Sequence, residues 1–247
     1  MRITETKGFK PHKSLLDEPF NFHNDYLEGC VFYLGQEGGL GGDSFLVDSN
    51  DYLTIFLMED MTGHGKRARK SIKKYLPDLE EIADLAASYN FNEEIFAEKI
   101  LSLDRVIDPM SMIAFTMVRV FPDGYTNFFN IGENAVYLRN ENGVRKLELQ
   151  KGKLGLFKII PHDTAFELHT IKLGINDVVL VGTDGVVEYT ASHKVYEARH
   201  ENITEVLKED LPLYEIAKLI NEDANNYLKS AGLDMYDDYT FLLFKMR

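Results

Sequence analysis

Residues 43–65 read DSFLVDSNDYLTIFLMEDMTGHG, and they contain two apolar runs, 44–47 and 52–58, separated by the polar turn DSND. β-prone runs that are bounded by turn residues predict two strands paired as a hairpin. The hairpin puts Asp43 at the start of one strand and Asp60 at the end of the other. The Gly-containing turn TGHG then leads into a segment of helical spacing. This stretch predicts antiparallel sheet followed by a helix, with carboxylates at the strand ends.

The rest of the chain extends the same pattern on both sides. Helical spacing covers 66–88, where Pro77 should kink or divide the helix, and a second helix follows Asn92, which suits its N-cap position. A further helical region covers 202–231. Strands are predicted at 30–34, 112–120, 125–131, 135–139, 144–149, 164–173, 177–181 and 239–246. Many hairpins and few βαβ units predict an α+β sandwich of mainly antiparallel sheets covered by helices.

Composition narrows the class of protein. Asp and Glu number 40 against 27 Lys and Arg, which gives a formal net charge of −13. Such a surface repels a polyanion, so we expect no nucleic-acid partner. The chain has no run of ~18 apolar residues that would span a membrane, and its start lacks the apolar core of a secretory signal. Cys30 is the single cysteine, so no internal disulfide is possible and we expect a cytoplasmic protein.

Acidic residues next to glycine recur at the predicted strand ends. Asp43 follows GLGG, Asp60 precedes TGHG, Asp184 precedes Gly185, and the pair Asp237–Asp238 precedes the last strand. Aspartate beside glycine is also common in ordinary turns, where its side chain bonds the nearby backbone. Glycine lets the backbone come close to a cation, and carboxylate oxygens suit Mg²⁺ or Mn²⁺ better than zinc. Four such positions favour a metal site without establishing it.

The order and the amino-acid sequences of these segments resemble the motifs of a known family. GGDSFLV, FLMEDMTGHGKRA, VVLVGTDGVVEYT and DDYTFLLFK occur in that order, with FFNIGENAVYLRN and KLGLF between them. They resemble the metal-dependent serine/threonine phosphatases of the type 2C (PPM) superfamily, and within it the SpoIIE-like bacterial branch. The resemblance implies a four-layer αββα fold for a domain at 29–247, with 1–28 as an N-terminal extension.

The resemblance also implies a centre of two Mn²⁺ or Mg²⁺ ions. In the family pattern Asp60 bridges both ions, and the backbone carbonyl of Met61 is a further ligand. Asp43 and Asp184 match ligand positions. At the end of the chain Asp237 is favoured as the ligand over its neighbour Asp238.

The implied reaction is direct hydrolysis of phosphoserine or phosphothreonine on a protein by a metal-bridging hydroxide, without a phosphoenzyme. For the SpoIIE-like branch the expected substrate is a phosphorylated anti-sigma-factor antagonist. His64, in TGHG, is a candidate general acid for the leaving group, or it simply lines the turn. Regulation would come from a protein partner or from another chain, or there would be none.

Two features depart from the family pattern. A basic run at the expected helix start either attracts a phosphorylated partner or forms a solvated face; it comprises Lys66, Arg67, Arg69, Lys70, Lys73 and Lys74. Glu133–Asn134 stands where the branch has Gly-His. These departures leave a second hypothesis for the function, in which the chain is a weakly active or inactive phosphatase-like scaffold that binds a regulatory partner.

A diguanylate cyclase is a poor alternative to either reading. GGDSFLV is only superficially like the cyclase signature GGDEF, because Ser44 stands where that motif needs an acidic residue. Only 42 residues precede Asp43, and the later TDGVVE and DDYT segments would have no role.

Overall fold

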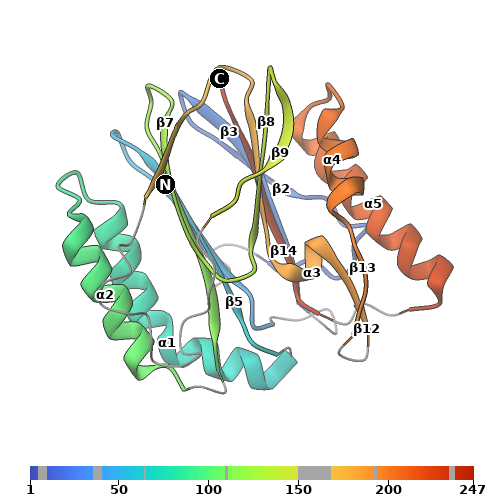
Figure 1. The fold of residues 1–247 in the computed structure, drawn as a ribbon, viewed down its shortest axis with the longest axis horizontal. Coiled ribbons are helices and arrows are strands. Elements are labelled where there is room, and N and C mark those ends of the chain that lie inside the picture. Colours follow the sequence, from blue (N-terminus) through green and yellow to red (C-terminus); the bar gives the residue numbers. More distant parts are fainter. Residues whose placement is uncertain are drawn as a thin grey trace. The chain divides into compact units, whose positions relative to one another are not determined.

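The structure is a computed structural model that describes residues 1–4, 10–35, 41–63, 65–108, 111–149, 168–191, 194–233 and 237–247. The chain forms two compact units, each with its own sheet and helices (Figure 1). Unit 1 comprises Met1–Phe9, Gly42–Asn134 and Leu149–Lys172. Unit 2 comprises Lys10–Gly41, Ala135–Glu148 and Leu173–Arg247.

The sheet of unit 1 contains six strands within the described residues, in the order β1-β4-β5-β6-β7-β10. They are β1 (Arg2–Thr4), β4 (Ser44–Ser49), β5 (Thr54–Met61), β6 (Ile113–Val120), β7 (Tyr125–Ile131) and β10 (His169–Lys172). Every neighbouring pair is antiparallel. The predicted hairpin is the pair β4–β5, with Ser44 opposite Glu59 and Ser49 opposite Thr54.

Alternation along β5 separates a core face from a second face. Ile55, Leu57 and Met61 belong to the hydrophobic core that α1 (Gly65–Ala86) and α2 (Glu93–Val106) help to form. Because side chains alternate along a strand, Phe56 and Asp60 lie on the opposite face of the sheet. Because Ile55, Leu57 and Met61 face the core, the carboxylate of Asp60 points away from it.

The two helices of unit 1 follow the predicted pattern. α1 (Gly65–Ala86) is a single helix that contains Pro77, and its ribbon bends along its length (Figure 1). The proline therefore does not divide the helix, and a bend is one of the two outcomes that its missing N–H predicted. α2 (Glu93–Val106) begins at the predicted cap, because the Asn92 side chain accepts hydrogen bonds from Glu94 N at 2.9 Å and Ile95 N at 3.1 Å.

The sheet of unit 2 also has six described strands, in the order β2-β3-β14-β11-β8-β9. They are β2 (Phe20–His23), β3 (Leu27–Leu34), β14 (Tyr239–Met246), β11 (Val178–Gly182), β8 (Ala135–Asn140) and β9 (Gly143–Lys146). All the neighbours pair antiparallel. The closing strand β14 is central, and seven of its eight residues are buried, which explains its continuous apolar sequence.

The helices of unit 2 are α3 (Asp184–Val187), α4 (His200–Lys208) and α5 (Leu213–Ala231). The predicted helical region 202–231 is thus two helices, interrupted before Pro212. α5 buries Ile216, Ala217 and Ile220 against the core, and its C-cap is Gly232, whose left-handed φ of 63° favours glycine. The hairpin β12 (Glu188–Ala191) with β13 (Lys194–Ala198) was not predicted.

Most predicted elements are confirmed, and a few fall elsewhere. The predicted strand at 164–173 is represented by β10, and its first part, 164–167, lies outside the described residues. The predicted N-terminal extension supplies β1 and β2, each an edge strand of its sheet, and the domain boundary after residue 28 stays a prediction. No described helix is both long and apolar enough to cross a membrane.

Candidate functional site

Asp43 and Asp60 come together at one end of the hairpin in unit 1. Ser44 stands opposite Glu59 in the β4–β5 ladder, so Asp43, one residue earlier, faces Asp60, one residue later. Asp43 is only 2% exposed, whereas Asp60 is half-buried. Two carboxylates held close together repel each other unless a cation or proton lies between them. The β4–β5 register therefore places Asp43 and Asp60 opposite each other at the end of the hairpin.

The backbone around this pair is packed too tightly for a side chain at Gly42. A β-carbon added there would lie 2.9 Å from the carbonyl oxygen of Met61 and 3.2 Å from that of Gly63. It would also lie 2.8 Å from the β-carbon of Ala68, in α1. Glycine is thus required where the chain passes the Met61 carbonyl, the oxygen that the resemblance assigns to a metal ion.

Asn134 belongs to a buried polar network beneath the end of β5. Its Nδ2 donates to Thr116 Oγ1 at 3.1 Å and to the Met58 carbonyl at 3.4 Å. Thr116 Oγ1 donates to Asn130 Oδ1 at 2.5 Å, so the network joins β5, β6 and β7. The neighbouring Glu133 is exposed. Of the Glu133–Asn134 pair, Asn134 therefore has a role in holding the strand that carries Asp60.

Asp184 lies at the end of a central strand in unit 2. It is the first residue of the four-residue helix α3, directly after β11, and it is half-buried. Thr183, just before it, is bonded to Thr240 of β14 through both its backbone N–H and its side-chain hydroxyl. Its N–H donates to the Thr240 carbonyl at 3.0 Å, and its Oγ1 accepts from Thr240 N at 3.2 Å. These bonds hold the Asp184 turn against the start of β14.

Asp237 and Asp238 precede β14 and lie beside that turn. A β-carbon at Gly185 would overlap the Asp238 carbonyl oxygen and lie 3.6 Å from the Asp237 β-carbon. A β-carbon at Gly41 would overlap the Asp238 carboxylate. Asp184, Asp237 and Asp238 are therefore neighbours, and the two glycines are required by this close approach.

The two adjacent aspartates differ in their surroundings. The Asp238 carboxylate is 1% exposed and lies against Gly41. Asp237 is more accessible, and its Oδ1 accepts a hydrogen bond from Asp238 N at 2.8 Å. The preference for Asp237 as a ligand rests on the family pattern and stays a prediction.

Arg199 is a residue that the sequence analysis missed. Its guanidinium is 1% exposed and donates through Nη1 to the Val186 carbonyl at 2.8 Å. Nη2 donates to the Ile220 carbonyl at 2.8 Å and to Asp223 Oδ2 at 2.9 Å. Arg199 thus ties α3, which begins at Asp184, to α5. No local pattern in YEARHEN indicates this role, because all of its partners are distant in sequence.

The chemistry of these groups fits divalent ions that prefer oxygen. The candidate ligands are carboxylates and one carbonyl, which suit Mg²⁺ or Mn²⁺. Within the described residues of either unit, no three His, Cys, Asp or Glu side chains are arranged to hold an ion by themselves. Asp43 and Asp60 belong to unit 1, and Asp184, Asp237 and Asp238 belong to unit 2. His64, the candidate general acid, lies outside the described residues.

A surface pocket in unit 2 lies away from Asp237 and Asp238 of the same unit. Its volume is about 350 Å³, and its lining includes His23, Glu28 and Arg247. Arg247 follows the last residue of β14, whereas Asp238 precedes the first. The pocket therefore lies at the opposite end of β14 from Asp238.

Comparisons with known proteins agree with this fold. Residues 50–247 match the profile of a family described as Stage II sporulation protein E (SpoIIE). No curated protein matches the chain in sequence. Among solved structures, RsbX in complex with magnesium superimposes with a TM-score of 0.62 at 19% identity, covering 93% of this chain and 100% of RsbX.

Two multidomain structures are similar as well. One is the PP2C phosphatase domain of SpoIIE from Bacillus subtilis with a fragment of its regulatory domain, with a TM-score of 0.70 and 19% identity over 91% of this chain. The other contains the RsbU and RsbW domains of Rv1364c from Mycobacterium tuberculosis, with a TM-score of 0.69 and 19% identity over 97% of this chain. This chain spans 64% of each. The predicted α+β phosphatase fold is therefore confirmed.

Proposed function

Since the chain belongs to the Stage II sporulation protein E (SpoIIE) family and has the PP2C phosphatase fold, we propose that it is a metal-dependent phosphatase of phosphoserine or phosphothreonine in proteins. The observation that carries this proposal is the position of the aspartates. They lie at strand ends in both sheets, near glycines at which an added β-carbon would collide with an aspartate or with the nearby backbone. A bound cation favours the charged form of neighbouring carboxylates and offsets their mutual repulsion.

The residues that would hold the metal ions are Asp43, Asp60, the Met61 carbonyl, Asp184 and Asp237. Two bound Mn²⁺ or Mg²⁺ ions would supply an activated water and neutralise charge on the phosphoryl oxygens. The protein's part is to hold these oxygens in place. The β4–β5 ladder fixes Asp43 against Asp60, and the bonds between Thr183 and Thr240 fix the Asp184 turn against β14.

The overall reaction converts a phosphomonoester and water into a free hydroxyl and phosphate. The P–O bond to the serine or threonine oxygen breaks, and that oxygen takes up a proton. His64 is the proposed donor of this proton, and a water is the other source. The proposed substrate is a phosphorylated anti-sigma-factor antagonist, as in the SpoIIE-like branch, and a regulatory protein is a further proposed partner.

The test is turnover of p-nitrophenyl phosphate and of a phosphoserine peptide with Mn²⁺. We expect EDTA to abolish turnover and Asp60→Asn to lower kcat/KM more than about 100-fold, because even residues behind a metal ligand contribute about 10- to 100-fold. Asp51→Asn is the matched control, since Asp51 is an exposed turn residue in the same unit. Asp237→Asn and Asp238→Asn, compared side by side, identify the ligand.

Three outcomes would count against parts of the proposal. Folded protein without Mn²⁺-dependent turnover would favour the scaffold that binds a partner. Unchanged turnover in Asp60→Asn would refute the proposed metal ligands, but it would leave the phosphatase activity standing. Equal loss in Asp51→Asn would show that the effect of Asp60→Asn is not specific to the site.

A further inference from the structure

The first half of α1 carries an exposed cationic surface, which we call the basic face. Its spacings of three, four and seven residues place these side chains on one side of the helix. The other side of the helix is buried and includes Ala68, Ile72 and Tyr75. All members of the basic face are exposed, and they are Lys66, Arg67, Lys70, Lys73 and Lys74.

The charges of α1 run against its helix dipole. The positive end of the dipole lies at the N-terminus, where acidic side chains stabilise a helix and basic ones destabilise it. α1 has no acidic residue in its first turn and no basic residue in its last. Its second half carries the opposite charge, at Asp78, Glu80, Glu81 and Asp84. Both ends of the helix are therefore unfavourably charged.

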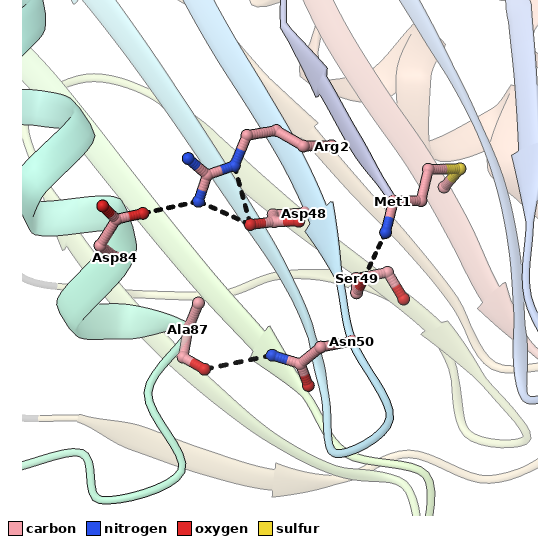
Figure 2. A network of polar contacts seen from close by, with 7 residues as sticks. All are labelled: Met1, Arg2, Asp48, Ser49, Asn50, Asp84 and Ala87. Carbon is pink, nitrogen blue, oxygen red and sulfur yellow. Dashed lines mark hydrogen bonds and ion pairs between the residues drawn. The ribbon is translucent and has the colours of Figure 1, made fainter.

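Other elements of unit 1 neutralise the acidic end. Lys99 Nζ, from α2, lies 3.1 Å from Asp78 Oδ1 and 2.5 Å from Glu81 Oε2. Arg2 Nη2, from β1, lies 2.6 Å from Asp84 Oδ1 and 2.7 Å from Asp48 Oδ2, so that it bridges the helix and the sheet (Figure 2). These pairs raise the pKa of Lys99, chiefly through Glu81, and the pKa of Arg2, chiefly through Asp84. The fold thus supplies counter-charges where the second half of α1 needs them.

The basic face receives no such counter-charge. Lys66, Arg67, Lys70 and Lys73 make no ion pair with any part of the chain that the structure describes. Among the described residues, Lys74 reaches only Tyr75, with its Nζ 3.3 Å from the hydroxyl and 4.9 Å from the ring centroid. Like charges three and four residues apart repel each other, so the face weakens its own helix. A partner of opposite charge would remove that penalty.

The basic face begins beside the candidate site. α1 starts four residues after Met61, and Ala68, in its second turn, lies against the backbone at Gly42, next to Asp43. The face rises from Lys66 to Lys74, which is about 12 Å at 1.5 Å per residue. An extended peptide covers that length with about four residues at ~3.3 Å each.

We propose that the basic face docks a short acidic segment of the phosphorylated protein substrate and so brings its phosphate to the aspartates of unit 1. This inference rests on the proposed function and adds a class of substrate to it. An acidic protein segment fits better than nucleic acid, because the net charge of −13 repels a long polyanion beyond the few residues that the face can neutralise.

The first test measures binding in the presence of EDTA, where turnover is absent. The probe is a fluorescein-labelled 12-residue peptide with a central phosphoserine and four consecutive glutamates, and its twin has glutamine in their place. We expect the natural protein to bind the glutamate peptide about tenfold more tightly, since each exposed ion pair contributes little but four act together. This preference should disappear when Lys66, Arg67, Lys70 and Lys73 are all changed to Gln, and it should weaken in high salt.

The matched control changes Lys13, Arg145, Lys146 and Lys229 to Gln. These residues are exposed in unit 2. Like the basic-face variant, the control replaces three lysines and one arginine and so removes the same charge. The control should keep the preference for the glutamate peptide. The proposal is wrong if the basic-face variant keeps the preference, if the control loses it equally, or if a 12-base-pair DNA duplex or anionic vesicles bind the basic face more tightly than the glutamate peptide.

Turnover with Mn²⁺ gives the second readout. The ratio of kcat/KM for the glutamate peptide to kcat/KM for p-nitrophenyl phosphate should fall about tenfold in the basic-face variant, mainly through KM. An unchanged ratio would overturn the proposal. Selective binding without turnover of any substrate would support the docking of an acidic segment and contradict the phosphatase activity, so the two failures are distinguishable.

Discussion

Cys30 lies in β3 with no exposed surface, and burial raises the pKa of its thiol to about 12. Only the thiolate reacts with disulfide reagents, so the native thiol is doubly protected. We expect Ellman's reagent at pH 8 to label native protein on the order of a thousandfold more slowly than protein in concentrated urea. Cys30→Ala supplies the blank. Rapid labelling of the native state would show that β3 opens readily.

Asn221 is a buried polar residue that should lower the stability of the fold. It lies on the core side of α5, is 1% exposed, and neither atom of its amide has a hydrogen-bond partner among the described residues. Burying such a group without partners costs about 1–3 kcal/mol. We therefore expect Asn221→Leu to raise the free energy of unfolding by about 1 kcal/mol in urea titrations.

The control for this change is Asn226→Leu, at an exposed position of the same helix. Its effect should stay within about 0.5 kcal/mol. A lower stability of Asn221→Leu would show that the Asn221 amide has a partner in the folded protein, such as a buried water.

At the scale of elements, Arg199 joins pieces that are distant in sequence. It binds the Val186 carbonyl in α3, the Ile220 carbonyl in α5 and Asp223. Arg199→Met would leave these acceptors without their donor, and breaking a buried pair typically costs about 3–5 kcal/mol. We expect the free energy of unfolding to fall by about 3 kcal/mol, measured in urea.

The same variant should also affect the metal. Because α3 begins at Asp184, we expect the apparent affinity for Mn²⁺ to fall about tenfold in Arg199→Met, as for other groups that orient a ligand. Arg145→Met, at an exposed position of β9, is the control and should leave both quantities nearly unchanged. A loss of stability at full Mn²⁺ affinity would make Arg199 purely structural.

Sequence patterns predicted most of the elements, and the misses share a cause. The hairpin β4–β5, the Asn92 cap of α2 and the closing strand β14 each follow from residues close together in the chain. α3 is only four residues long, and β12–β13 is a short hairpin whose residues show no clear alternation. Short elements depend on tertiary contacts, which a local pattern does not contain.

At the scale of the whole molecule, binding of the proposed metal ions should raise the stability of the folded protein. A ligand that binds only the folded protein raises its stability by about 2.7 kcal/mol at 100 times its Kd. For a chain of this size we therefore expect saturating Mn²⁺ to raise Tm by about 5–10 °C, measured by differential scanning fluorimetry. EDTA should reverse the shift.

Substitutions in each unit test whether both contribute to this stabilisation. Asp60→Asn in unit 1 and Asp184→Asn in unit 2 should each remove most of the Mn²⁺ shift, whereas Asp51→Asn should keep it. A full shift in either site variant would exclude that aspartate from the centre. Because the shift needs no substrate, it separates metal binding from catalysis.

The sequence by itself determined the α+β class, most strands and helices, and the aspartates that the proposal uses. It did so because hydrophobic periodicity, turn residues and caps act over a few positions of the chain. Only the tertiary structure decided which aspartates are neighbours, which glycines leave room for them, and that Arg199 holds the Asp184 turn. These relations join residues tens to hundreds of positions apart, so they arise only when the strands pair and the helices pack.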